Sequence, residues 1–154
     1  MWKHLVGLDR TSPGFATVRI APKIDGIYGP KSVRGQFLSP SGLIKSSWRL
    51  TATVAGHAHG FNLNISLPIG VQSAEVSVPA PPADDFTPTE DIRSPGNSLV
   101  VSAREQRVVC NGKVVWSNGK FTAVDGVTTA WLAADGAGVV FGTTNGVFTF
   151  VSHN

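Results

Sequence analysis

Apolar and polar residues alternate along several short segments of the chain. The clearest segment is FNLNISLP, in which Phe61, Leu63, Ile65 and Leu67 alternate with asparagine and serine. A period of two is typical of a β-strand with one buried face and one solvated face. We therefore expect this segment to be a strand whose apolar side faces the core.

A second alternating pattern is interrupted by a turn. The segment SVRGQF leads into SPSG, residues 39–42, and the chain continues as LIKSSWRL. Turn-forming residues between two alternating runs predict a β-hairpin. In its second strand, Trp48 shares a face with Ile44, Ser46 and Leu50, so we expect Trp48 to lie in the core.

The second half of the chain contains regularly spaced turn signals. Pairs of asparagine or aspartate with glycine recur every seven to ten residues or so, and such pairs readily adopt the positive φ angles of tight hairpin turns. The pairs are Asn111-Gly112, Asn118-Gly119, Asp125-Gly126, Asp135-Gly136 and Asn145-Gly146. Their spacing predicts a meander of short strands. Residues 79–97 break the pattern, because proline and acidic residues are frequent there, and we expect an exposed loop.

The N-terminus has a different periodicity. Trp2, Leu5, Val6 and Leu8 are apolar at roughly helical spacing, which predicts that residues 1–10 are the remnant of a preceding helix. The expected fold is therefore all-β, an antiparallel β-sandwich with a short N-terminal helical stub. A length of 154 residues suits a single domain over residues 1–154.

Composition narrows the classes of function. The 13 basic and 10 acidic residues give a net charge of +3 without any basic run, so no nucleic-acid partner is expected. The chain has neither a run of about 20 apolar residues nor an evident secretory signal, so we expect no membrane partner and a cytoplasmic location. The single cysteine, Cys110, is expected to be a reduced strand residue.

Catalytic and metal-binding patterns are weak. Clustered acids occur only in the proline-rich loop, where a solvated surface explains them better than a rigid pair of catalytic carboxylates. His57 and His59 could begin a metal site, but no further ligand is placed beside them by the sequence. No metal site, cofactor or catalytic residue is therefore expected.

The candidate ligand-binding residues are aromatic or basic. Trp116 stands beside the polar turn Ser117-Asn118-Gly119-Lys120, where an indole could stack on a ligand, whereas Trp131, between alanine and leucine, is expected in the core. Arg34 and Lys45 should project from the wet side of the first hairpin. The expected binding surface comprises Trp116 and this wet side, with His57 and His59 at its margin. The candidate ligands are carbohydrate or a small molecule.

Several segments together resemble a known family. The succession WKHLVGLD, PGFATVRIAPK, the SPSG turn and IKSSWRL resembles the C-terminal end of bacterial and fungal α-L-rhamnosidases. In that family the first element closes an (α/α)6 catalytic barrel, and an antiparallel β-sandwich follows. The turn NGK at residues 111–113 and the closing GVFTFV are similar to that domain's last strands. The chain departs from the family at Ser41, where tyrosine is common, and in the enlarged connection at residues 80–96.

The resemblance implies a non-catalytic accessory β-sandwich that stabilises a barrel or contacts carbohydrate. The family's general acid and base lie in the barrel, so no glycosidase activity is expected from this chain alone. Two alternatives stay open. One is a free-standing lectin or assembly partner that forms oligomers or binds a protein through Trp2, Leu5 and Val6. The other is a repurposed small-molecule-binding protein that acts as a non-hydrolytic cyclase or isomerase.

Overall fold

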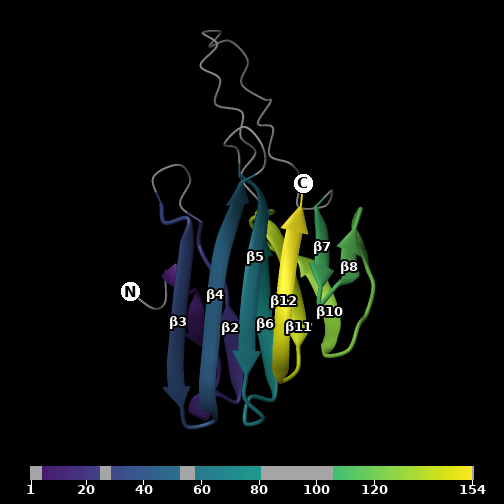
Figure 1. The fold of residues 1–154 in the computed structure, drawn as a ribbon. Helices are drawn as coiled ribbons and strands as arrows, with labels where there is room; N and C mark the ends of the chain where they lie inside the picture. Colours follow the sequence, from purple (N-terminus) through teal and green to yellow (C-terminus); the bar gives the residue numbers. More distant parts are fainter. Residues whose placement is uncertain (1–4, 25–28, 53–57, 81–105, 154) are drawn as a thin grey trace, which may run out of the picture.

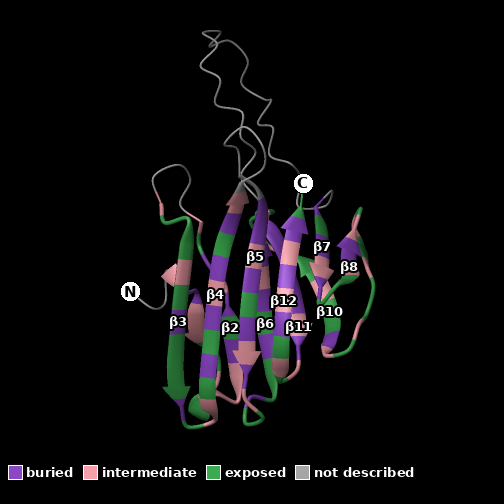
Figure 2. Cartoon of the chain, viewed as in Figure 1, coloured by how far each residue is buried: buried purple, intermediate pink, exposed green. Residues whose placement is uncertain are grey.

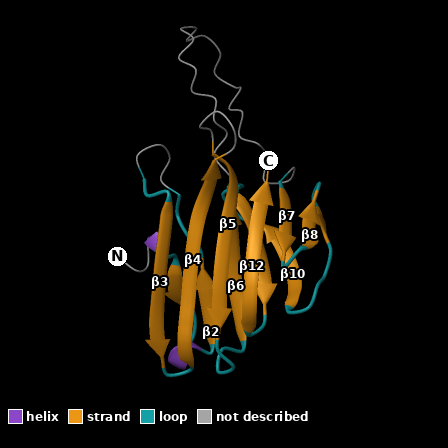
Figure 3. Cartoon of the chain, in the orientation of Figure 1, coloured by secondary structure: helices purple, strands orange, loops and turns teal. Residues whose placement is uncertain are grey.

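The chain folds into two β-sheets that pack face to face. The computed structural model describes residues 5–24, 29–52, 58–80 and 106–153, except for the side chains of residues 52, 58 and 59. The all-β sandwich expected from the alternating segments is confirmed (Figure 3). No helix among the described residues combines the length and the hydropathy needed to cross a membrane.

Both sheets combine strands from distant parts of the sequence. The smaller sheet contains, in spatial order, β1 (Leu8–Arg10), β2 (Thr17–Ile20), β6 (Ser73–Pro79), β11 (Gly138–Thr143) and β10 (Val127–Leu132). The larger sheet contains β3 (Ser32–Ser39), β4 (Gly42–Ala52), β5 (Ala58–Leu67), β12 (Gly146–His153), β7 (Arg107–Cys110), β8 (Lys113–Ser117) and β9 (Lys120–Phe121). The larger sheet is in front in Figure 1. Strands β2 and β6 pair in parallel, and the other pairs are antiparallel.

Alternation along the strands separates the core from solvent. In β5, Phe61, Leu63, Ile65 and Leu67 are all buried, as expected from the sequence, while the intervening side chains are partly or fully exposed. The same stripes run along β4 (Figure 2). Both hairpin strands expected around the SPSG turn are confirmed as β3 and β4.

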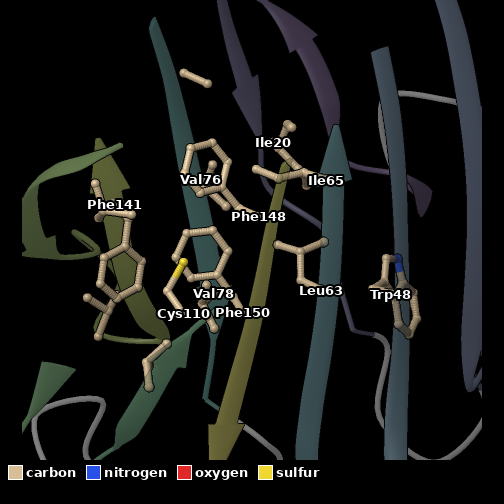
Figure 4. Packing of buried hydrophobic residues seen from close by; sticks show 14 of the residues in the cluster. Ile20, Trp48, Leu63, Ile65, Val76, Val78, Cys110, Phe141, Phe148 and Phe150 are labelled. Atoms are coloured by element: carbon tan, nitrogen blue, oxygen red, sulfur yellow. The ribbon is translucent and has the colours of Figure 1, made fainter. Parts of the chain in front are cut away.

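Aromatic side chains join the two sheets in the core. Phe141 of β11 and Phe150 of β12 stack with their ring centroids 5.2 Å apart, and Phe148 lies 6.2 Å from Phe150 (Figure 4). Cys110 is buried in the same cluster, as a strand residue. The contact between Phe141 and Phe150 joins the two sheets, so they share one core.

Tight turns close the hairpins where the sequence predicts them. Asn111 and Gly112 have φ angles of 49° and 82°, and Asn118 and Gly119 have φ angles of 50° and 77°. Two successive positive φ angles are what a two-residue hairpin turn of the primed type requires. The expected turns between β7 and β8 and between β8 and β9 are therefore confirmed.

The N-terminal stub differs from its expected form. Leu8–Arg10, expected at the end of a helix, forms strand β1 and pairs with β2. Gly7 precedes it with a φ angle of 75°, a left-handed conformation that interrupts a helix and lets the chain extend. Leu5 is helical and Val6 lies in a turn, so the described helical part of the stub ends before Gly7; the 3-10 helix η1 (Pro13–Phe15) follows β1. Trp2 lies outside the described residues.

The described part of the stub packs on its own sandwich. Val6 is buried, and the carbonyl oxygen of Leu5 accepts a hydrogen bond of 2.8 Å from Nε1 of Trp48. The backbone N–H of Ala21 donates to the carbonyl of Gly7 at 2.8 Å. These contacts tie the segment before β1 to both sheets.

The proline-rich loop begins after the smaller sheet's central strand. Pro79, expected in the loop, is the last residue of β6, and the N–H of Ala80 donates to the carbonyl of Ala137 at 2.8 Å. The rest of the expected loop, residues 81–97, lies outside the described residues.

Candidate functional site

The outward face of the larger sheet carries a continuous set of polar side chains. Because Ile44, Ser46, Trp48 and Leu50 point into the core, the intervening residues of β4 point away from it. Strands β3, β5 and β12 present polar residues on the same side. We call this surface the polar face; its members are Arg34, Gln36, Lys45, Ser47, Arg49, Asn62, Asn64, Ser66 and Thr149.

Strand register arranges the polar face in rows across four strands. Arg34 of β3 lies opposite Ser47 of β4, Ser47 lies opposite Asn64 of β5, and Asn64 lies opposite Thr149 of β12. Opposite residues on one face of a sheet have Cβ atoms about 5 Å apart, so each row offers adjacent hydrogen-bonding groups. Gln36, Lys45 and Ser66 form a second row, and Arg49 and Asn62 belong to a third.

The polar face is hollowed into an open groove. The groove has a volume of about 1050 Å³, just above the range of about 300–1,000 Å³ that is usual for ligand sites. Residues of β3, β4, β5 and β12 line it. Space of this size admits an extended ligand lying across the strands.

One row is held by side-chain hydrogen bonds. Oγ1 of Thr149 donates to Oδ1 of Asn64 at 2.8 Å. The backbone of β12 is held in turn by Asn111, whose Oδ1 accepts from the N–H of Thr149 at 2.8 Å and whose Nδ2 donates to the carbonyl of Val147 at 3.3 Å. With its oxygen engaged, Asn64 keeps its amide N–H groups available as donors.

Three cations lie close together on this face. Arg34 is diagonal to both Lys45 and Arg49 across the β3–β4 pair, because the residues directly opposite are Ser47, Gln36 and Ser32. Diagonal neighbours are about 7–8 Å apart at their Cα atoms, within reach of long side chains. All three are exposed, and within the described residues none of them has an ion pair or a side-chain hydrogen bond.

The structure brings together only part of the surface expected from the sequence. Arg34 and Lys45 do project from the solvated side of the hairpin and share the polar face. His57 lies outside the described residues. His59 falls in β5, but its side chain is among those not described.

The expectations for two tryptophans were wrong. Trp116 is 5% exposed and belongs to the core cluster, so its indole cannot offer an open stacking surface. The β7–β8 register shifts between Val108 and Val109, and the neighbouring residues Val115 and Trp116 are both buried as a result. Trp131, expected in the core, is 42% exposed, because its neighbour Ala130 faces the core, so Trp131 points to the outer face, and β10 is an edge strand.

The exposed Trp131 lines a second groove, on the outer face of the smaller sheet. It lies opposite Val140 of β11, and Val140 lies opposite Ser77 of β6. Asp9 and Arg19 line the same groove. Beside it, Nε of Arg19 approaches Oε2 of Glu75 at 3.7 Å, an exposed ion pair of small energetic value.

Other residues of the polar face were missed by the sequence reading. Arg49, Asn62, Asn64 and Thr149 each occupy a polar position of an alternating strand, which is the signal that could have identified them. Among the described residues, no three histidine, cysteine, aspartate or glutamate side chains lie close enough together to hold a metal ion.

Cys110 provides a chemical probe of the core. Burial away from water raises the pKa of its thiol to about 11, because the charged thiolate is poorly solvated there. At pH 8 only about one thiol in a thousand is then ionised, and the thiolate is the reactive form. We expect a thiol-specific disulfide reagent to modify the native protein at least about a hundredfold more slowly than the protein in denaturant. Equal rates in the two conditions would contradict this packing.

Comparisons with known proteins agree with the sandwich. Residues 7–93 match the family model described as the bacterial alpha-L-rhamnosidase C-terminal domain. Among solved structures, the chain is similar to Streptomyces avermitilis alpha-L-rhamnosidase complexed with L-rhamnose, with 23% sequence identity and a TM-score of 0.59. The match covers 98% of this chain and 10% of that one, so the chain spans about a tenth of that protein's length. A search of curated proteins found no match.

Proposed function

Because the chain belongs to the family of bacterial alpha-L-rhamnosidase C-terminal domains, we propose that it is a non-catalytic accessory β-sandwich that contacts carbohydrate through the polar face. The observation that carries the proposal is the set of rows of amide, hydroxyl and guanidinium groups across β3, β4, β5 and β12. Sugar hydroxyls both donate and accept hydrogen bonds, so alternating donors and acceptors on a rigid sheet suit them.

The placement of carboxylates favours binding over hydrolysis. Inverting glycoside hydrolysis uses two carboxyl groups about 6.5–9.5 Å apart on opposite sides of the scissile bond. None of the described carboxylates, Asp9, Glu75, Asp125 and Asp135, lines the groove of the polar face. A ligand bound there would meet hydrogen-bonding and cationic groups of this chain.

A second candidate function is association with a protein domain through the smaller sheet. Trp131 and Leu132 are 42% and 43% exposed on neighbouring positions of β10. Exposed aromatic and aliphatic side chains of this kind are frequent where a protein partner docks. The N-terminal stub is less suited to that role, because Val6 is already buried in its own sandwich.

A titration tests the carbohydrate proposal. Oligosaccharides containing L-rhamnose or galacturonate are titrated into the protein while backbone amide chemical shifts are followed. We expect shifts at β3, β4, β5 and β12, and a loss of affinity of about two- to twelvefold in Asn64→Ala, since one hydrogen bond contributes about 0.5–1.5 kcal/mol. Gln72→Ala, an exposed polar residue outside the polar face, is the matched control and should bind as the parent does. Shifts confined to the smaller sheet, or no binding of any oligosaccharide, would refute the proposal.

A further inference from the structure

We propose that the polar face selects an anionic glycan, one that carries carboxylate groups at intervals along its chain. This inference rests on the proposed carbohydrate-contacting function and specifies the class of ligand. It comes from how charge is divided between the two sheets.

The described charges are segregated by sheet. The strands of the larger sheet contain only basic charged residues, apart from histidine; they are Arg34, Lys45, Arg49, Arg107, Lys113 and Lys120. The described carboxylates lie instead in β1 and β6 and in the turns beside β10, where Arg10 and Arg19 offset part of their charge. A modest net charge of +3 therefore hides one sheet that is positive throughout its described length.

The cation cluster is placed where an anion would be held. Arg34 lies diagonally between Lys45 and Arg49, and like charges at neighbouring positions of a sheet repel one another. No described carboxylate relieves that repulsion. A carboxylate bound beside Arg34 would do so, and arginine can donate two parallel hydrogen bonds to it.

The spread of the cations favours a polymer over a small anion. Lys45 and Arg49 are four residues apart on β4, which is about 13 Å at the usual rise of a strand. Asn62, Asn64 and Thr149 continue the groove away from the cations and offer groups for uncharged hydroxyls. A chain of sugars with charges at intervals uses both parts of the groove.

The same features favour a glycan over a nucleic acid. Proteins that bind single-stranded nucleic acid combine cations with aromatic side chains on which bases stack. The polar face has no aromatic member, since Trp48 points into the core from the same strand. Its uncharged members are amides and hydroxyls, which match sugar hydroxyls.

The experiment compares two forms of one ligand. The probes are a galacturonate oligosaccharide and its fully methyl-esterified form, which share a sugar backbone and differ in charge. We expect the parent protein to bind the acidic form at least tenfold more tightly at low salt, with the difference shrinking as salt screens the charges. Arg34→Gln should remove most of this preference, and Arg10→Gln, which removes one charge from the smaller sheet, should keep it.

The outcomes separate this inference from the proposed function. Binding of both forms with equal affinity at the polar face would overturn the anionic preference and leave the carbohydrate function standing. Binding of neither form, nor of any other oligosaccharide, by a protein with an intact circular dichroism spectrum would overturn both. Equal binding of a single-stranded DNA oligonucleotide would overturn selectivity for a glycan. Because removing Arg34 relieves repulsion, Arg34→Gln should melt no lower than the parent, so its loss of binding cannot be assigned to unfolding.

Discussion

Replacement of Phe150 by alanine is expected to lower the free energy of unfolding by about 3–5 kcal/mol. Phe150 is fully buried on β12, the strand between β5 and β7 in the larger sheet. Its ring stacks on Phe141 of the opposite sheet and contacts Phe148 of its own strand. The substitution therefore removes apolar contacts and leaves a cavity between the sheets.

The measurement is urea unfolding followed by tryptophan fluorescence, supported by thermal melting. For a domain of this size, each kcal/mol corresponds to about 2–4 °C in Tm, so we expect a fall of roughly 6–20 °C. Val147→Ala is the matched control, because Val147 is on the same strand but 70% exposed, and its effect should stay within about 0.5 kcal/mol. A loss below about 1 kcal/mol in Phe150→Ala would contradict the shared core.

Removal of residues 1–7 should destabilise the sandwich by about 3–5 kcal/mol relative to a variant that begins at Leu5. The deletion exposes the site filled by Val6, and burial of one such side chain contributes about 1.5–3 kcal/mol. It also removes the Leu5 carbonyl that accepts from Nε1 of Trp48, a side chain only 2% exposed. A buried donor without its partner costs about 1–3 kcal/mol more.

A double-mutant cycle identifies the hydrogen-bond part of this effect. Trp48→Phe keeps most of the ring but has no N–H, so the same deletion should cost about 1–3 kcal/mol less in that background. Stability is read from denaturant midpoints in all four proteins. Equal costs in the two backgrounds would show that the Trp48–Leu5 hydrogen bond contributes nothing. An unchanged midpoint after deletion would show that the segment is a passive tail.

Local periodicity was sufficient to predict most of the sandwich. The alternation in β5 identified its buried face residue by residue, and the same reasoning placed Trp48 correctly. Asparagine-glycine pairs identified two hairpin turns because few residues tolerate the positive φ angles that those turns require. Both signals depend on neighbours in the sequence, which is why they can be read without the structure.

The tryptophan errors arise from features that neighbours in sequence do not encode. Trp116 follows a polar turn, but the register shift in the β7–β8 pair directs it into the core. Trp131 has alanine and leucine beside it, but its strand is at a sheet edge, and edge position depends on the order of strands in space. The helical spacing holds at Leu5 but was extended too far, since Leu8 is held in a strand by its pairing with Ile20.

The sequence predicted only the part of the candidate site that lies within one hairpin. Arg34 and Lys45 share a local β3–β4 register that the SPSG turn determines. Thr149 joins them only because β12 pairs with β5, and that pairing connects segments far apart in the chain. Arg49 belongs to the same hairpin and could have been included from its alternation alone.

The parallel pairing of β2 with β6 has a consequence for the order of folding. Thr17 of β2 aligns with Ser73 of β6, and Val76 of β6 aligns with Phe141 of β11. Strand β6 therefore brings together three segments that are far apart in the chain. The β3–β4 and β4–β5 hairpins can form early, because their loops are short and little chain entropy is lost in closing them. During synthesis, β1 and β2 must wait for β6, and the smaller sheet cannot be completed until β11, which ends at Thr143, is available. We therefore expect folding in milliseconds to seconds, as is usual for sheets rich in long-range contacts.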